Sequence, residues 1–504
     1  MALNLLGDLL ALLALAVVVA AGWVAWRRPF VGLGFLVAGM AFHNFLLMVL
    51  LRLGTSHVLV RVVQLWKEGL LALLVVIAGL RLLRAYREGR RGRPVALDWV
   101  AAAFFLIMLI YLLLPSGVLG STASLQGRLA SFRIVALMPV LYALGRTFQG
   151  AGERDLARAV WLVVGAAAVV GAFGMVELWL IPTRAWLDWG VNDFSAWLGY
   201  QYHGPQSLPE NFFQTLGADA YLRRIVSTYL SPLGVAYTAL LVLPIAVVLA
   251  ESRHIGRRAR AVAAVAVALI VASILFSVTR LAIFALVGEV VLLAFIIRRP
   301  FMYGLVALTV VASVLTILFY ASVAPLVDRN LNPTALTGGG VAGASDPSFL
   351  EHFRTLEADL RVAVRHPLGE GLGSSGSSAN RFSNGAQNPN YAPGESAVLS
   401  MFVDTGVPGG LAYLALYLLG IYVAARGLPA VVTRGTLESA LPMAAFVGGL
   451  ALMPITLTSD VWGDLSVTFL FWWAVGYSAS LAAAREPASW RAWLTWQQPR
   501  VVST

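Results

Sequence analysis

A single glutamate stands where a long polar segment meets an apolar run. The segment from Arg365 to Gly410 reads RHPLGEGLGSSGSSANRFSNGAQNPNYAPGESAVLSMFVDTGVPGG, and Glu395 follows Pro393-Gly394 at the beginning of its apolar part. A glutamate in this position can accept a proton from a hydroxyl group as a general base. A glutamate at a helix N-terminus is also common because it complements the helix dipole, so both interpretations stand.

Arginines form a second group, because several lie where an apolar run begins. Arg223 and Arg224 precede one such run, and Arg280 stands between two others. The planar guanidinium group can donate two parallel hydrogen bonds to phosphate oxygens, although arginines also anchor helix ends at a membrane interface. The candidates for catalysis are Glu395, Arg280 and Arg224. The candidates for substrate binding are Arg128, Arg133, Arg223, Arg354, Arg361, Arg365 and Tyr391.

Other polar patterns indicate chemistry less strongly. Gly369, Gly371 and Gly373 resemble a nucleotide-binding loop, but that fingerprint requires a strand before it and a helix after it. Asp460 and Asp464 are the nearest approach to a pair of acidic metal ligands, and their spacing is a weak signal. We therefore expect no metal and no cofactor.

Polar residues also occur inside the apolar runs. His43 and Asn44 lie in the second run, and Lys67 and Glu68 lie in the third. Ionisable residues inside a membrane are functional candidates by default. We nevertheless expect these four to be structural, with Lys67 paired to a neighbouring acid.

The composition sets the protein class. Hydrophobic residues make up 59% of the 504 residues and charged residues only 12%, whereas soluble proteins carry about 25% charged residues. Apolar runs of about 20 residues recur, as a membrane of ~30 Å requires, and they predict an all-α polytopic membrane protein with about 13 transmembrane helices. A membrane β-barrel would alternate apolar and polar residues instead. The absence of cysteine excludes disulfides and thiolate metal sites.

The net charge of +11 sets the orientation and does not indicate nucleic-acid binding. Basic residues accumulate in cytoplasmic loops, and the run RAYREGRRGR after the third span is the strongest such marker. We expect helices 1–10 in residues 1–322, with an outer loop at 182–222. A long periplasmic loop at 323–395, helices 11–13 at 396–484 and a cytoplasmic tail at 485–504 follow. The candidate arginines then lie on the outer face, where arginine is less expected.

The two outer loops have different compositions. Trp186, Trp189 and Trp197 in the first loop are typical of the membrane interface, although such rings can also stack on sugars. In the second loop, a capping box at Ser348–Glu351 predicts a helix that ends before Pro367. Its apolar stripe is Leu350, Phe353, Leu356, Leu360 and Val364, so we expect this helix to lie on the membrane surface or on the bundle.

Several of these segments, taken in order, resemble the superfamily of O-antigen ligases and O-antigen polymerases, over about residues 223–425. The matching segments are Arg224-Ile225-Val226-Ser227-Thr228-Tyr229, Thr279-Arg280-Leu281-Ala282, Arg354 with His366-Pro367-Leu368-Gly369-Glu370-Gly371-Leu372-Gly373, and Glu395-Ser396-Ala397-Val398-Leu399 with Asp404-Thr405-Gly406-Val407-Pro408-Gly409. The ligases have histidine and asparagine where this chain has Glu395 and Ser396, and Asp404 replaces their usual glutamate. The resemblance is therefore to the polymerases more than to the ligases.

The resemblance implies a metal-independent, inverting glycosyltransferase in the bacterial inner (cytoplasmic) membrane. The donor would be a glycan on polyprenyl pyrophosphate, Glu395 would be the general base, and Arg224 and Arg280 would hold the pyrophosphate. We expect polymerisation of O-antigen or similar repeat units at the periplasmic face. The implied partners are the lipid-linked oligosaccharide and membrane lipids, with a chain-length regulator and a flippase as further candidates and no nucleic acid.

Three alternatives remain open. The first is an O-antigen ligase that transfers the glycan to lipid A-core or another acceptor. The second is a flippase or other transporter of lipid-linked oligosaccharides, which would often contain two similar halves with broken helices at matching positions. The third is a structural assembly protein, which would leave the outer arginines unexplained.

Overall fold

The computed structural model describes residues 2–89, 93–121, 123–149, 152–199, 207–215, 221–252, 255–327, 347–376, 394–428 and 436–485. The helices of the first half are α1 (Ala2–Arg27), α2 (Pro29–Arg52), α3 (His57–Gln64), α4 (Trp66–Arg87), α5 (Ala96–Leu113), α6 (Ser116–Leu119), α7 (Leu125–Thr147), α8 (Glu153–Leu180), α9 (Ala185–Asp188) and α10 (Val191–Trp197). A short hairpin, β1 (Phe213–Thr215) and β2 (Tyr221–Arg223), lies between the 3-10 turns η2 (Glu210–Phe212) and η3 (Ser227–Tyr229).

The second half contains the remaining helices. These are α11 (Pro232–Glu251), α12 (Arg257–Phe276), α13 (Arg280–Ile297), α14 (Pro300–Val327), α15 (Pro347–Arg365), α17 (Ala397–Gly427), α19 (Ala440–Met443), α20 (Gly449–Thr456) and α21 (Leu465–Arg485). The 3-10 turn η5 (Leu437–Ser439) precedes α19, the π-helical turn η6 (Ala444–Gly448) joins α19 to α20, and the 3-10 turn η7 (Val461–Gly463) precedes α21.

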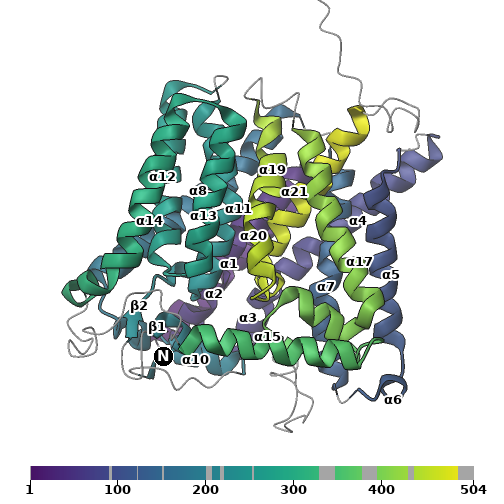
Figure 1. Cartoon of the computed structure of the whole chain (residues 1–504), viewed down its shortest axis with the longest axis horizontal. Coiled ribbons are helices and arrows are strands. Elements are labelled where there is room, and N and C mark those ends of the chain that lie inside the picture. Colours follow the sequence, from purple (N-terminus) through teal and green to yellow (C-terminus); the bar gives the residue numbers. More distant parts are fainter. Residues whose placement is uncertain are drawn as a thin grey trace, which may run out of the picture.

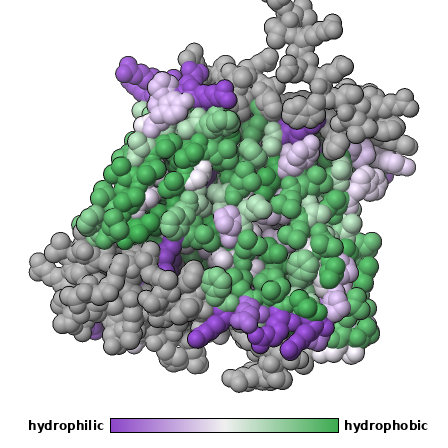
Figure 2. Space-filling model, in the orientation of Figure 1, coloured by the Kyte–Doolittle hydropathy of each residue, from purple (hydrophilic) through white to green (hydrophobic). Residues whose placement is uncertain are grey.

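The protein is an all-α polytopic membrane protein, as predicted. Within the described ranges, 13 segments are long and apolar enough to cross a membrane. Figure 1 shows their helices side by side in one bundle, with α15 lying across one end. Figure 2 shows a broad apolar band over this bundle and a hydrophilic strip along α15.

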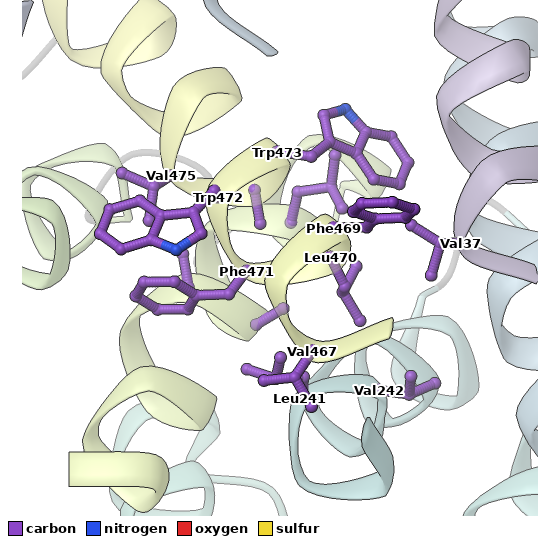
Figure 3. Packing of buried hydrophobic residues seen from close by; sticks show 14 of the residues in the cluster. Val37, Leu241, Val242, Val467, Phe469, Leu470, Phe471, Trp472, Trp473 and Val475 are labelled. Atoms are coloured by element: carbon purple, nitrogen blue, oxygen red, sulfur yellow. The ribbon is translucent and has the colours of Figure 1, made fainter. Parts of the chain in front are cut away.

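The core of the bundle is built around α21. Its residues Trp472 and Trp473 are fully buried, and Figure 3 shows them among side chains from α2 and α11. Glycines let α21 approach α7 closely, because a Cβ atom at Gly476 would lie 2.1 Å from the Tyr142 carbonyl oxygen. Such small-residue contacts replace the hydrophobic driving force that membrane helices lack. The helices therefore form a closely packed bundle behind the loops at both ends.

The first outer loop differs from the prediction at its central tryptophan. Trp186 is fully buried, and its ring packs edge-on against Phe173 and Phe212 with centroids 6.5 and 5.6 Å away. Trp197 donates a hydrogen bond of 3.2 Å to Gln64. Trp186 is therefore a core residue and not an interface anchor, because aromatic rings bury large apolar areas when a loop folds back on the bundle.

The third span is broken into α3 and α4 at Leu65, which the sequence did not predict. Polar contacts surround the break: the Lys67 ammonium group lies 3.2 Å from His43 Nε2 and 3.4 Å from Glu68 Oε2, and it donates to the Gln64 carbonyl. The pairing of Lys67 with a neighbouring acid is confirmed. Within the part of the chain that the structure describes, these residues act as a structural link between α2 and α4.

The seventh span begins later than expected. Arg223 ends β2, and α11 begins at Pro232, so the arginine pair does not itself start the helix. Leu230 has a left-handed φ of 55°, which ends the η3 turn, and Ser231 caps α11 through Gly234 N–H. Proline at the first helical position favours this beginning because its missing N–H has no partner there anyway.

The helix predicted in the second outer loop is confirmed. It is α15, which ends at Arg365 before Pro367. Its buried face carries Thr355 and Asp359, whereas Phe353, Leu360 and Val364 of the apolar stripe are more than half exposed. The helix therefore rests on the bundle with Thr355 and Asp359 in its buried face, and these three apolar side chains are left to face the membrane surface.

Candidate functional site

Glu395 lies directly before the first turn of α17 and against α15. The hydroxyl group of Thr355 donates a hydrogen bond of 3.3 Å to Glu395 Oε2, and the N–H of Gly394 donates one of 3.1 Å to Asp359 Oδ1. Gly394 has φ +64°, and a Cβ atom there would lie 2.1 Å from Gly376 N. Only glycine allows this approach, so Gly394 sets the position of Glu395.

Asp359 is a second carboxyl group at this point, and sequence reasoning missed it. Its side chain is fully buried, and its Oδ2 atom accepts no hydrogen bond from the described residues. Burial raises the pKa of Asp359 to about 6, the Gly394 hydrogen bond opposes this rise, and the charge of Glu395 adds to it. A carboxyl group that changes charge near neutral pH is suited to acid–base chemistry.

The beginning of α17 is fixed by the loop between α20 and α21. Ser396 caps the helix by accepting from Leu399 N–H at 3.1 Å, and its hydroxyl group donates to the Thr456 carbonyl at 3.3 Å. Ala397 N–H donates to the Ser459 carbonyl at 3.2 Å. Glu395 therefore belongs to a rigid junction of three elements, and serine in place of the asparagine of the ligases serves here as a helix cap.

Tyr237 connects Glu395 to the arginine side of the site. Its hydroxyl group donates a hydrogen bond of 3.0 Å to Ser459 Oγ. Arg224, Asp464 and Glu395 all lie close enough to act electrostatically on this hydroxyl group. The structure thus brings the predicted base and one predicted arginine, which are far apart in sequence, to one end of the bundle.

We call the set Arg224, Tyr237, Asp359, Glu395, Ser459 and Asp464 the α15-end site. Burial raises the pKa of Asp464 to about 6, and the N–H of Ser466 opposes this rise. Three carboxyl groups therefore share a small region with one buried guanidinium group. This arrangement combines a cationic part for an anion with an acidic part that can receive a proton.

Arg224 is buried and holds the turn that carries Arg280. Its Nε atom donates to the Ser277 carbonyl at 2.7 Å, and its Nη2 atom donates to Thr279 Oγ1 at 2.8 Å. Val278, inside the turn, has φ +50°, a strained conformation for a β-branched residue. Strain of this kind is often found at functional sites. Here the strained residue, Val278, directly precedes Thr279, the N-cap of α13.

Arg280 is the first residue of α13 and is half-buried. The residue before it, Thr279, accepts a hydrogen bond from Arg224, which acts electrostatically on Tyr237 together with Glu395. Arg280 therefore stands at the same end of the bundle as Glu395. The predicted position of Arg280 between two spans is confirmed.

Asp404 is held in a dense network of hydrogen bonds. It accepts hydrogen bonds from Ser131 Oγ at 3.2 Å, Gly373 N at 3.0 Å, Ser375 N at 2.9 Å and Ser375 Oγ at 2.8 Å. The α17 kink at Gly406 (φ 61°, ψ −161°) receives the same loop, because a Cβ atom at Gly369 would lie 2.5 Å from Gly406 N. The glycines of this loop allow its backbone to pack closely against α17, and the hydrogen bonds to Asp404 hold the loop there.

The remaining predicted arginines lie in structural or exposed positions. Arg128 donates to the carbonyls of Tyr111, Leu112 and Leu114 at the C-terminus of α5. Arg223 donates to the carbonyls of Ile181 and Glu177 at the end of α8. Arg133 pairs with Glu68 at 3.4 Å, Arg361 pairs with Glu357 at 2.7 Å, and Arg354 and Arg365 are exposed on α15. Tyr391 lies outside the described residues.

Two further residues position the arginine segment. Buried Glu177 accepts from Ser227 N–H at 2.7 Å, and Asn44 Nδ2 donates to the Tyr229 carbonyl at 2.8 Å. Both are polar residues inside apolar runs, and this signal singled out Asn44 and could also have identified Glu177. Asp359 gave no such signal, because an acid outside the apolar stripe of an amphipathic helix is expected to be exposed.

The sequence was also compared with known proteins. Neither the protein-family models nor the curated proteins gave a match to this chain.

Proposed function

We propose that the protein is a glycosyltransferase that uses a glycan on polyprenyl pyrophosphate as donor and polymerises O-antigen or similar repeat units. The observation that carries the proposal is that Arg224 and Glu395 both lie close enough to act electrostatically on the same hydroxyl group, that of Tyr237, at one end of a membrane bundle. A buried guanidinium group beside carboxyl groups suits the departure of pyrophosphate and the capture of a proton.

The proposed reaction is a direct displacement. The acceptor hydroxyl oxygen forms a bond to the anomeric carbon, while the bond from that carbon to the pyrophosphate oxygen breaks. The proton of the hydroxyl group goes to Glu395, and the leaving polyprenyl pyrophosphate takes the bonding electron pair. Arg280, at the beginning of α13, stabilises the charge of the leaving group. Displacement in one step inverts the anomeric configuration.

Asp359 has a supporting role in this proposal. Its ionised carboxyl group repels a second negative charge nearby, so it strengthens Glu395 as a base. Thr355 orients the Glu395 carboxylate by a hydrogen bond. Asp359 is therefore a positioning residue that acts through Glu395.

The test is an assay of the purified full-length protein with lipid-linked oligosaccharides extracted from the source organism, so that the sugar need not be known in advance. We expect longer lipid-linked chains and the release of polyprenyl pyrophosphate. Transfer to lipid A-core without chain lengthening would instead support the ligase. Movement of intact donor across a vesicle membrane, without a new glycosidic bond, would refute the transferase.

A further inference from the structure

A groove with a volume of about 1500 Å³ lies at the end of the bundle opposite α15. α4 and α5 both pack against α7, and the groove runs between them with residues of α7 and α21 as its floor. It shares no residue with the α15-end site. A function for this groove is therefore separate from the proposed transferase.

One end of the groove is strongly basic. Its lining contains Arg81, Arg84, Arg93 and Arg146 against one acid, Asp98. Arg146 is already engaged, because its Nε atom lies 3.3 Å from Asp98 Oδ1 and its Nη2 atom donates to the Arg93 carbonyl at 2.6 Å. Two further positive charges come from Arg81 and Arg84 of α4.

Arg81 and Arg84 stand one helical turn apart on α4. Both are exposed, and their charges lie close enough to act on one another. Within the described ranges, neither forms an ion pair with a carboxylate, and the Arg81 guanidinium group lies 5.2 Å from the centroid of the Phe148 ring. Like charges at this spacing destabilise a helix, so an anion between them would relieve the repulsion.

The acid of the groove is not available to repel such an anion strongly. Asp98 Oδ2 accepts from Val95 N–H at 2.8 Å, and Oδ1 accepts from the Tyr142 hydroxyl group. With Arg146 beside it, the Asp98 charge is compensated within the protein. The groove therefore retains a net positive potential at its polar end.

The other end of the groove is apolar and is lined mostly by small side chains. It is lined by Ala101, Ala102, Phe105, Pro139, Val140 and Ala143. Alanines on α5 and α7 leave space that larger side chains would fill. A basic end above an apolar channel within the membrane span matches a molecule with an anionic head and a hydrocarbon chain.

We propose that this groove binds a phospholipid with an anionic headgroup, with its phosphate between Arg81 and Arg84 and an acyl chain along the alanines of α5 and α7. Basic pockets between transmembrane helices bind anionic lipid headgroups in this way. A free phosphate ion would use the arginines but not the apolar channel, so the occupant is a membrane lipid.

The test is native mass spectrometry of the purified full-length protein, titrated with dioleoyl phosphatidylglycerol or with zwitterionic dioleoyl phosphatidylcholine. We expect specific binding of phosphatidylglycerol that Arg81→Gln/Arg84→Gln weakens about 30-fold, corresponding to about 2 kcal/mol. Ala143→Phe should weaken binding without any change of charge. The matched control is Arg257→Gln/Arg258→Gln, which removes two exposed arginines at the same end of the bundle on α12.

Each result decides the proposal. Equal phosphatidylglycerol binding by the Arg81/Arg84 variant and the Arg257/Arg258 control would overturn it, as would equal binding of phosphatidylcholine by the wild type. Complete displacement of the lipid by inorganic phosphate would show an anion site only. Because the substituted arginines are exposed, a normal size-exclusion profile is expected for both double variants.

Discussion

Asp359 and Glu395 are two carboxyl groups from separate elements that meet where α15 crosses the beginning of α17. The backbone N–H of Gly394 donates a hydrogen bond of 3.1 Å to Asp359, which fixes the distance between the helix and the glutamate that follows. The charge of Glu395 adds to the effect of burial on Asp359. Two acids held together in this way, with a buried arginine nearby, cost stability and therefore suggest a function.

Asp359→Asn should stabilise the protein while it reduces activity. The pKa of Asp359 is raised to about 6 from 3.8, so the folded state disfavours the charged form. This destabilisation is absent below about pH 4, grows as pH rises towards 6, and is complete above it. The difference in Tm between the variant and the wild type should follow this curve.

Asp359→Asn should also be less active than the wild type. Without the charge beside it, Glu395 is a weaker base, so kcat should fall about tenfold and the acid limb of the pH profile should move to lower pH. Asn can keep the hydrogen bond from Gly394, so folding should be intact. An unchanged pH profile would mean that Asp359 does not act through Glu395.

Asp404→Asn should loosen the glycine-rich loop. Gly373 N–H and Ser375 N–H donate to different oxygens of the carboxylate, so the amide NH₂ group of the variant must face one of these two donors. Loss of hydrogen bonds to a charged group should cost about 2 kcal/mol. Hydrogen exchange at residues 369–376 should become faster, whereas exchange in α21 should not change. Equal exchange at residues 369–376 in the variant and the wild type would show that Asp404 does not hold the loop.

Arg280→Lys should lose about 100-fold in turnover, because lysine keeps the charge but not the bidentate geometry. The matched control is Arg361→Lys, an exposed arginine paired with Glu357 on α15. Arg224→Lys is less informative, because it also removes the contacts to Ser277 and Thr279 that hold the turn. Near-native turnover in Arg280→Lys would reduce Arg280 to a helix-end anchor.

Topology can be tested with single cysteines, since the chain has none. Glu357 on α15 and Glu88 at the end of α4 are exposed, so cysteines at these positions should react readily. With the predicted orientation, an impermeant reagent added to intact cells labels Glu357→Cys and not Glu88→Cys. Labelling of both from one side would contradict the orientation.

Hydrophobic run lengths predicted the number of spans well, because a membrane demands about 20 apolar residues wherever a helix crosses it. The end of α15 before Pro367 followed from proline chemistry, and its beginning near the capping box followed from the Ser348–Glu351 pattern. These features depend on neighbouring residues in the chain. Local sequence is therefore sufficient to predict them.

Features that depend on tertiary contacts were not predicted. The break at Leu65 arises where Lys67 meets His43, and the late beginning of α11 depends on a left-handed residue, Leu230. Asp359 lies in an ordinary amphipathic helix, and only its contact with Gly394 distinguishes it from an exposed acid. The contact of Arg224 with Thr279 likewise joins segments that no local pattern relates.

The most direct measurement of the central claim compares Glu395→Gln with Glu357→Gln, an exposed glutamate on α15. Turnover of lipid-linked oligosaccharide and binding of undecaprenyl pyrophosphate should be measured on the same purified proteins. We predict that Glu395→Gln loses roughly 100- to 10,000-fold in turnover while it still binds undecaprenyl pyrophosphate, and that Glu357→Gln retains both. Near wild-type chain extension by Glu395→Gln would contradict the account, because a helix-dipole role for Glu395 affects stability by under ~1 kcal/mol and not turnover.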